Sequence, residues 1–300
     1  MYKRHNKRQE IQFPLPRRPV QAHKGDFGRL LILAGSEGYT GAPVLAARAA
    51  LRTGAGLVFL GVPRDIYPIV AVKCDEAMPF PLPEDHRAIL DRAIGCDAVL
   101  IGPGLGRRPE TERLVLELLE ELEVPVVLDA DGINALSGHI DVLDGRGAPT
   151  VLTPHEGEFV RLTGCSLPIG DRLSAARDFA AAHRCTVVLK GRGTVTAAPD
   201  GRVWVNSTGG PGMAKGGSGD VLAGMTAALW GQRLLRRGED DLPRLAAAAV
   251  YYHGLAGDLC AGRFGEYAML PGDMIEALPQ VLKEQEDQEG SPCAEGCSVY

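Results

Sequence analysis

Short runs of aliphatic residues recur along the chain at intervals that suit strands alternating with helices. Each run ends at Gly, Asp or Thr. Because the runs are continuously apolar rather than alternating, they predict parallel strands that are buried on both faces of a sheet. We expect these strands within residues 30–35, 57–63, 98–104, 124–132, 149–158 and 186–194.

Segments with a helical pattern separate these runs, at residues 42–53, 109–122 and 173–183. This rhythm predicts an α/β fold with a mostly parallel sheet, helices on both faces and right-handed crossovers. A small hairpin is expected near residues 194–206, because Pro, Asp and Gly at 199–201 suit a tight turn. Three helical segments are predicted to follow, from Asp220, from 242 to about 261, and over 271–282.

The bulk composition limits the classes of protein. Residues 1–300 suffice for a single domain, with a core over about 22–284 and flexible ends near 1–20 and 285–300. The net charge is −6, and acidic and basic residues are interspersed. The sequence therefore lacks the basic stripe of a nucleic-acid surface. No apolar run has the length of a membrane span, and the basic start lacks the apolar core of a signal peptide. We expect a cytoplasmic protein with no nucleic-acid or membrane partner.

Seven cysteines occur without regular spacing. Five of them are predicted to be small buried or half-buried apolar residues: Cys74, Cys96, Cys165, Cys185 and Cys260. Cys293 and Cys297 lie in a polar tail, and no second Cys/His pair accompanies them to complete a metal site. We therefore expect a disordered tail with free thiols.

Polar residues gather where the predicted strands end. Ligands of an open parallel sheet bind beyond the carboxyl ends of its strands, so these loops are the candidate site. They are Gly102–Gly106, Asp129–Asp131, Thr153–Glu158 and Lys190–Thr194.

A fifth segment, STGGPGMAKGGSGDVLAG at residues 207–224, is rich in glycine and precedes an apolar helical run. It is not a Walker A loop, because Lys215 is followed by Gly216. GPGLGR at 102–107 likewise lacks the spacing of a dinucleotide fingerprint. The amides of Gly216, Gly217, Ser218 and Gly219 are instead predicted to hold an anion at a helix start. Asp220 is either an N-cap or a base that activates a hydroxyl.

Six blocks in a fixed order carry a family resemblance over roughly residues 22–284. They are HKGDFGRLLILAGSEGYTGAPVLAARAALRTGAGLV, IGPGLG, LDADGINAL, LTPHEGEF, LKGRGTV and GGPGMAKGGSGDVLAG. With these blocks the chain resembles the ADP/ATP-dependent NAD(P)H-hydrate dehydratases. The resemblance implies a ribokinase-like fold. It also implies removal of water from the 6S hydrate of NADH or NADPH (NADHX or NADPHX), with ADP, or ATP in some members, as phosphoryl donor.

The resemblance also implies roles for single residues. Asp220 resembles the catalytic base, and the amides of the glycine loop resemble an anion hole for the transferring phosphoryl group. Ala42, Gly104 and His155 resemble residues that contact the hydrate. The residues that resemble the nucleotide site are Lys190, Gly191, Arg192, Gly193, Thr194 and Gly219.

Asp129 and Glu158 are expected to organise Mg²⁺ through water, since Mg²⁺ retains several of its waters in proteins. Lys215 either neutralises phosphate or points to solvent, and the sequence leaves both open. Two other functions also stay open: a ribokinase-like kinase of the hydroxymethylpyrimidine or hydroxyethylthiazole type, and a non-catalytic nucleotide sensor. His155 argues against the pyrimidine kinases, which place Asn in its slot, and Asp220 argues against a sensor.

The twenty-odd residues before the matched region are too few for the epimerase domain that often precedes this one. We therefore expect a monofunctional protein that depends on a separate NAD(P)H-hydrate epimerase. We also expect a homo-oligomer, either a dimer or a tetramer.

Overall fold

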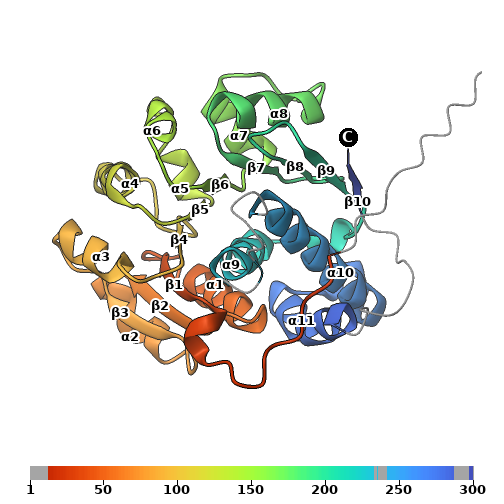
Figure 1. Cartoon of the computed structure of the whole chain (residues 1–300), viewed down its shortest axis with the longest axis horizontal. Helices are drawn as coiled ribbons and strands as arrows, with labels where there is room; N and C mark the ends of the chain where they lie inside the picture. The colour runs from red at the N-terminus through yellow and green to blue at the C-terminus, as the bar shows by residue number, and fades with distance from the viewer. Residues whose placement is uncertain (1–12, 233–234, 236–241, 287–296, 300) are drawn as a thin grey trace, which may run out of the picture.

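The computed structural model describes residues 13–232, 235, 242–286 and 297–299. Their strands form one sheet in the order β10-β9-β8-β7-β6-β5-β4-β1-β2-β3 (Figure 1). The neighbours from β7 to β3 are parallel: β1 (Arg29–Leu33), β2 (Leu57–Val62), β3 (Met78–Pro81), β4 (Ala98–Ile101), β5 (Val126–Leu128), β6 (Thr150–Leu152) and β7 (Thr186–Leu189). The antiparallel strands are β8 (Val195–Ala197), β9 (Val203–Asn206) and β10 (Cys297–Val299).

Helices cover both faces of this sheet. One layer holds α1 (Gly41–Arg52), α2 (Tyr67–Ala71), α9 (Ser218–Gly231), α10 (Leu242–Ala268) and α11 (Pro271–Glu286). The other holds α3 (His86–Ala93), α4 (Pro109–Glu121), α5 (Asp131–Asn134), α6 (Asp141–Asp144), α7 (Glu156–Thr163) and α8 (Arg172–Ala182). Successive residues of one strand enter opposite layers, as Leu30 and Leu31 of β1 do. The continuous apolar runs are therefore explained by a sheet that is buried on both faces, as predicted.

The sequence did not predict α2, β3 and α3 near one edge of the sheet, nor α5, α6 and α7 in the other part of the fold. Pro79 and Pro81 in β3 have no backbone N–H to donate to a neighbouring strand. Their presence is typical of a loop rather than a strand. An edge strand tolerates them because only one of its sides is paired. The hairpin prediction is confirmed, since β8 and β9 pair antiparallel across residues 198–202.

Residues next to both ends of the predicted core pack against the rest of the protein. The side chain of Phe13 is buried against Tyr251, with ring centroids 5.8 Å apart. Leu15 N donates to the carbonyl of Gln285 within α11, which continues to Glu286. The tail also differs from the prediction, because Cys297 begins β10 and pairs with Asn206 of β9. Cys293 lies outside the described residues.

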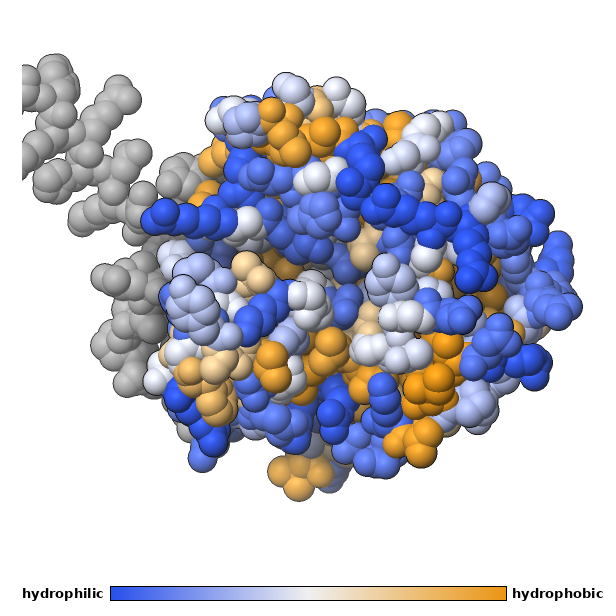
Figure 2. All heavy atoms as spheres, turned by 180° about the vertical axis from the view of Figure 1, so that it is seen from behind, coloured by the Kyte–Doolittle hydropathy of each residue, from blue (hydrophilic) through white to orange (hydrophobic). Residues whose placement is uncertain are grey.

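Figure 2 shows hydrophilic residues interspersed with separate groups of hydrophobic ones on the face opposite to that of Figure 1. Among the described residues, no helix combines the length and hydropathy needed to cross a membrane. Of the five cysteines predicted to be buried or half-buried, Cys165 is the exception, since its side chain is exposed.

Candidate active site

Asp220 lies in the first turn of α9 but does not cap the helix. The N-cap is Gly217, whose φ of 101° is left-handed, and no side chain accepts a capping bond there. Burial raises the pKa of Asp220 to about 7, the nearby charge of Asp129 adds to this effect, and Lys190 opposes it. The geometry therefore removes the N-cap alternative and leaves a carboxyl group that titrates near neutrality, as a general base requires.

A buried cluster of charged and polar side chains lies beside this turn. Lys190 Nζ is 2.8 Å from Asp129 Oδ1, and Thr153 Oγ1 donates to the same oxygen over 2.6 Å. Glu158 Oε2 is 3.8 Å from the ammonium. Burial lowers the pKa of Lys190, but the carboxylates of Asp129 and Glu158 outweigh it and hold that pKa above its usual value. Lys190 therefore stays charged, and its side chain points into the protein.

This cluster does not fit direct coordination of Mg²⁺. The described residues bring no three His, Cys, Asp or Glu side chains together as a metal site. The ammonium of Lys190 already neutralises Asp129 and approaches Glu158, and its charge repels a divalent cation. The expected organisation of Mg²⁺ through water stays a prediction.

The glycines of the segment 207–224 have different surroundings. A Cβ on Gly219 would lie 3.4 Å from Lys190 Nζ and 3.9 Å from Asp129 Oδ2, so this glycine faces the charged cluster. A Cβ on Gly216 would meet nothing within 4 Å, which leaves its side of the loop open. Gly224 instead permits close packing, because a Cβ there would lie 2.1 Å from the carbonyl oxygen of Ala46 in α1. The glycine enrichment thus serves helix packing as well as an open loop.

Lys215 has a hydrogen-bond partner in the protein, which the sequence did not predict. Its Nζ donates to the carbonyl of Tyr267 over 2.6 Å. This carbonyl belongs to the last residues of α10, beyond the non-helical Gly265. Lys215 therefore ties the glycine-rich segment to the end of α10, where a cation is favourable.

His155 is the N-cap of α7, a role that sequence reasoning missed. Its Nδ1 accepts from the amides of Gly157 and Glu158, at 3.0 and 3.2 Å. Glu158 Oε2 in turn accepts from the backbone N–H of His155, which completes a capping box. Since Nδ1 accepts, the proton of the neutral ring is on Nε2, 3.4 Å from Glu158 Oε1. The ring is about half exposed, so one edge remains accessible.

The predicted site residues come together in two neighbouring groups. His155 forms a parallel bridge with Lys190, which joins the loop after β6 to the loop after β7. Ala42 and Gly104 form the other group, since a Cβ on Gly104 would lie 3.0 Å from that of Ala42. The groups approach each other through α1 and α9, because a Cβ on Gly217 would lie 2.7 Å from Leu45 Cδ1.

The turn between β5 and α5 separates two acidic side chains that flank Ala130. Ala130 has a φ of 49°, an unusual value for a residue with a Cβ. This conformation lets Asp129 pair with Lys190 while Asp131 accepts from the amide of Gly106 over 2.8 Å. The strained residue therefore lies at the candidate site, where such conformations tend to be found.

Two buried polar atoms at the first turn of α9 were also not predicted from the sequence. Ser218 Oγ and His253 Nε2 have no hydrogen-bond partner among the described residues. Burial lowers the pKa of His253 to about 4, while a hydrogen bond to the Ser218 backbone acts in the opposite direction. A neutral imidazole of α10 therefore supports the first turn of α9.

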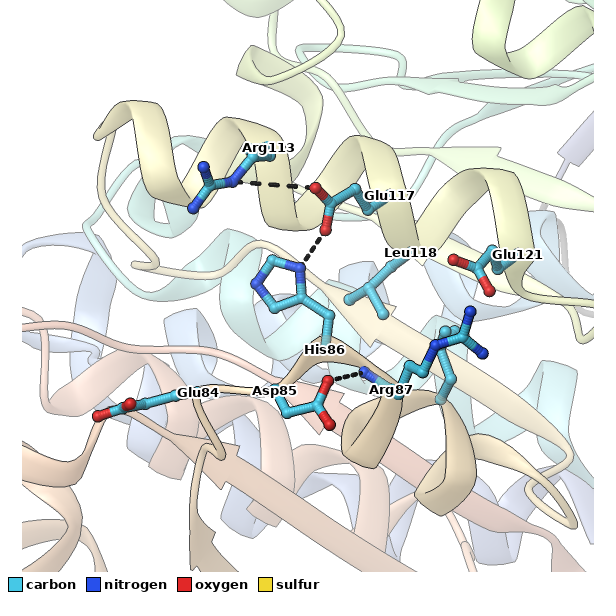
Figure 3. A pocket seen from close by; sticks show the side chains of 9 residues that line it. Glu84, Asp85, His86, Arg87, Arg113, Glu117, Leu118 and Glu121 are labelled. Atoms are coloured by element: carbon cyan, nitrogen blue, oxygen red, sulfur yellow. Dashed lines mark hydrogen bonds and ion pairs between the residues drawn. The ribbon is translucent and has the colours of Figure 1, made fainter.

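A hollow of about 410 Å³ lies elsewhere, between α3 and α4 (Figure 3). Three of its polar side chains contact one another: His86 Nδ1 contacts Glu117 Oε2, and Arg113 Nε is 3.9 Å from Glu117 Oε1. None of the predicted site residues lines it. The candidate site therefore remains at the carboxyl ends of the strands.

A family model described as NAD(P)H-hydrate dehydratase (Carb_kinase) matches residues 30–280. The chain belongs to this family. The ADP-dependent (S)-NAD(P)H-hydrate dehydratase of Bacillus subtilis is 34% identical over 282 residues, which cover 93% of this chain and 97% of that relative. The resemblance inferred from the six sequence blocks is thus confirmed.

A bifunctional relative matches more strongly over part of its length. The NAD(P)H-hydrate repair enzyme Nnr of Moorella thermoacetica is 46% identical over 286 residues, 91% of this chain and 53% of that enzyme. This chain therefore spans about half the length of the bifunctional family members.

A solved structure confirms the ribokinase-like fold. It is the ADP/ATP-dependent NAD(P)H-hydrate dehydratase from Bacillus subtilis, co-crystallised with ATP/Mg²⁺. Its TM-score to this chain is 0.78 at 34% sequence identity, with 91% of this chain and 95% of the other covered.

Proposed function

We propose that this protein dehydrates (6S)-NADHX and (6S)-NADPHX to NADH and NADPH, with ADP as phosphoryl donor. The observation that carries the proposal is Asp220, a carboxyl group with a pKa of about 7 beside the open side of the glycine loop. Membership of the dehydratase family supports it, and the name of the Bacillus subtilis relative supports ADP as donor.

In the first step, Asp220 takes the proton of the 6-hydroxyl as the hydroxyl oxygen attacks the β-phosphorus of ADP and AMP leaves. Hydroxide is a poor leaving group, and phosphorylation replaces it with phosphate. The amides of Gly216–Gly219, at the positive end of α9, stabilise the charge on the transferring group. The ammonium of Lys190 holds Asp129 in place and favours the ionised form of Asp220.

In the second step, the ring nitrogen donates its lone pair, the C6–O bond breaks and phosphate leaves. Loss of a proton from C5 then restores the dihydropyridine. The balance is one hydrate and one ADP consumed for one reduced nicotinamide, one AMP and one phosphate. We assign the hydrate to the side of Ala42, Gly104 and His155, and the nucleotide to Lys190–Thr194 with Gly219. No step is assigned to Mg²⁺, because Asp129 and Glu158 do not fit its direct coordination.

The test is product analysis with prepared (6S)-NADHX and either ADP or ATP. We expect NADH, AMP and phosphate in equal amounts from ADP. Turnover with ATP while ADP is inert would overturn the choice of donor. Phosphorylation of hydroxymethylpyrimidine or hydroxyethylthiazole, with no action on the hydrate, would favour the kinase alternative.

A separate epimerase that converts the 6R hydrate is the partner we propose. Adding this epimerase should allow complete conversion of a mixed 6R/6S preparation.

A further inference from the structure

Arg172, the first residue of α8, donates hydrogen bonds to the backbone of the loop that follows β7. Its Nη1 donates to the carbonyls of Arg192 and Gly193, at 2.7 and 3.2 Å. Its Nη2 donates to the carbonyl of Leu189 over 2.9 Å. One guanidinium therefore fixes three carbonyls of a single turn, an arrangement that needs several donors in a rigid plane.

The other side of this guanidinium faces α7. Arg172 Nε lies 3.0 Å from Glu156 Oε1, an ion pair that is not aligned as a hydrogen bond. Glu156 follows His155 directly, so Arg172 connects the loop after β6 with the loop after β7. The side chain of Arg172 is only 19% exposed, which strengthens these charged contacts relative to surface pairs.

The absence of a side chain at Gly191 leaves room for the guanidinium of Arg172. Its φ is 153°, and a Cβ there would lie 2.6 Å from Arg172 Nη2. Any side chain at this position would displace the guanidinium. The requirement for glycine at 191 thus follows from Arg172 as well as from the backbone conformation.

Two further carbonyls of the turn are also engaged. The carbonyl of Gly191 accepts from Thr194 Oγ1 over 3.0 Å, and that of Thr194 accepts from the amide of Asn206 over 2.9 Å. Within the described part of the chain, the amides of Arg192 and Gly193 have no protein acceptor. Protein donors therefore hold the carbonyl oxygens of the turn in place. The N–H groups of Arg192 and Gly193 are left to bind a ligand with phosphate oxygens.

We propose that Arg172 is a positioning residue for an adenine-nucleotide loop at Lys190–Thr194, and that it acts by fixing the carbonyls of that loop. This inference rests on the proposed function, which assigns the loop to ADP and AMP. In this proposal Arg172 acts through the backbone of the loop and contacts neither nucleotide nor hydrate. Its removal should weaken nucleotide binding and leave the chemistry at Asp220 largely intact.

The test compares Arg172→Gln and Arg172→Lys with Arg177→Gln, a change on the same helix at an exposed residue that pairs with Asp178. Calorimetry with AMP alone should give a Kd raised about 10- to 100-fold in Arg172→Gln, as expected for the loss of charge-assisted hydrogen bonds. Arg172→Lys should recover part of this loss, and Arg177→Gln should match the wild type. The KM for ADP should rise in parallel, with kcat and the KM for hydrate within about threefold.

Hydrogen exchange of a peptide covering residues 186–197, without ligand, reads the loop directly. We expect faster exchange in Arg172→Gln and in Gly191→Ala, and no change in Arg177→Gln. Because both variants release the same contact, combining them should add little to either.

Unchanged exchange together with an unchanged Kd for AMP would overturn the inference. Faster exchange with an unchanged Kd would overturn it too, because the loop would then not bind the nucleotide. If the wild type binds AMP as described but never converts hydrate, the proposed function fails while the positioning role of Arg172 stands.

Discussion

Lys190 Nζ lies 2.8 Å from Asp129 Oδ1, although 61 positions separate the two residues in the sequence. This pair gives Asp220 two charged neighbours of opposite sign. Asp129 raises the pKa of Asp220, and Lys190 lowers it. The balance between them, together with burial, places that pKa at about 7.

The first prediction is that this pair sets the pH dependence of the reaction. A base with a pKa of about 7 makes kcat/KM rise as the pH increases through neutrality. Lys190→Met should move this limb to higher pH, and Asp129→Asn should move it to lower pH. The measurement is kcat/KM between about pH 5 and 9. Displacements of the same sign in both variants would contradict the electrostatic assignment.

The second prediction concerns stability. Because the pKa of Asp220 is raised from 3.8 to about 7, the folded state binds more protons than the unfolded state between these values. The free energy of unfolding therefore falls as the pH rises through this window. Asp220→Asn removes that loss and should be more stable than the wild type above pH 7, by on the order of a few kcal/mol.

Denaturant unfolding of both proteins at pH 4 and pH 8 measures this difference. We expect the advantage of Asp220→Asn at pH 8 and little of it at pH 4. An ionised N-cap would have the opposite effect, since its carboxylate would accept hydrogen bonds from the first amides of the helix and stabilise it. A less stable Asp220→Asn protein at pH 8 would therefore count against the burial that raises this pKa.

Most of the fold could be predicted because the strands are short and buried on both faces. The apolar runs at residues 30–35 and 98–104 contain β1 and β4, which pair at the centre of the sheet. The apolar pattern fails at β3, where prolines occupy an edge strand, and at Phe13, which is buried against Tyr251 of α10. In both cases the decisive contact comes from a distant part of the chain.

The third prediction separates the two roles of His155. His155→Ala removes the cap of α7 and should cost about 1 kcal/mol of stability. His155→Asn keeps a favoured capping oxygen and should remain close to the wild type in stability. If the ring contacts the hydrate, both variants should lower kcat/KM for hydrate by about 1–3 kcal/mol.

The affinity for AMP, measured by calorimetry without hydrate, is the control for this experiment. In His155→Asn it should change much less than the kinetics with hydrate. Wild-type kinetics in His155→Asn would show that the histidine is only a helix cap.

The fourth prediction uses the position of Gly219, which faces the charged cluster. A methyl group there would lie 3.4 Å from Lys190 Nζ and enter the space beside Asp220. We expect Gly219→Ala to lower kcat/KM about 10-fold or more, since small displacements at a reacting centre are costly. The fold should persist, because Ala is a better helix former than Gly.

Gly145→Ala is the matched control, since a Cβ there would meet only the carbonyl oxygen of Val142, at 3.8 Å. Full activity in Gly219→Ala would mean that no ligand occupies the space next to the charged cluster. Thermal unfolding of both variants shows whether an activity loss arises from the site or from the fold.

The sequence could indicate the loops of the site but not the contacts between them. Asp220 and Lys190 were expected at strand and helix ends, where parallel sheets bind ligands. Three contacts could not be predicted, because they depend on side-chain conformation or on distant residues that no local pattern encodes. They are the ion pair of Lys190 with Asp129, the capping of α7 by His155, and the hydrogen bonds from Arg172 to the loop after β7. Lys215 illustrates the same limit, because its partner Tyr267 follows 52 positions later.

The most direct test of Asp220 as the base is turnover of prepared (6S)-NADHX with ADP by the wild type and by Asp220→Asn. The amide retains the shape of the side chain and removes the proton acceptor. We predict that AMP binds both proteins with similar affinity, while kcat in the variant falls by about 10²–10⁴. Near wild-type turnover by Asp220→Asn would contradict the account.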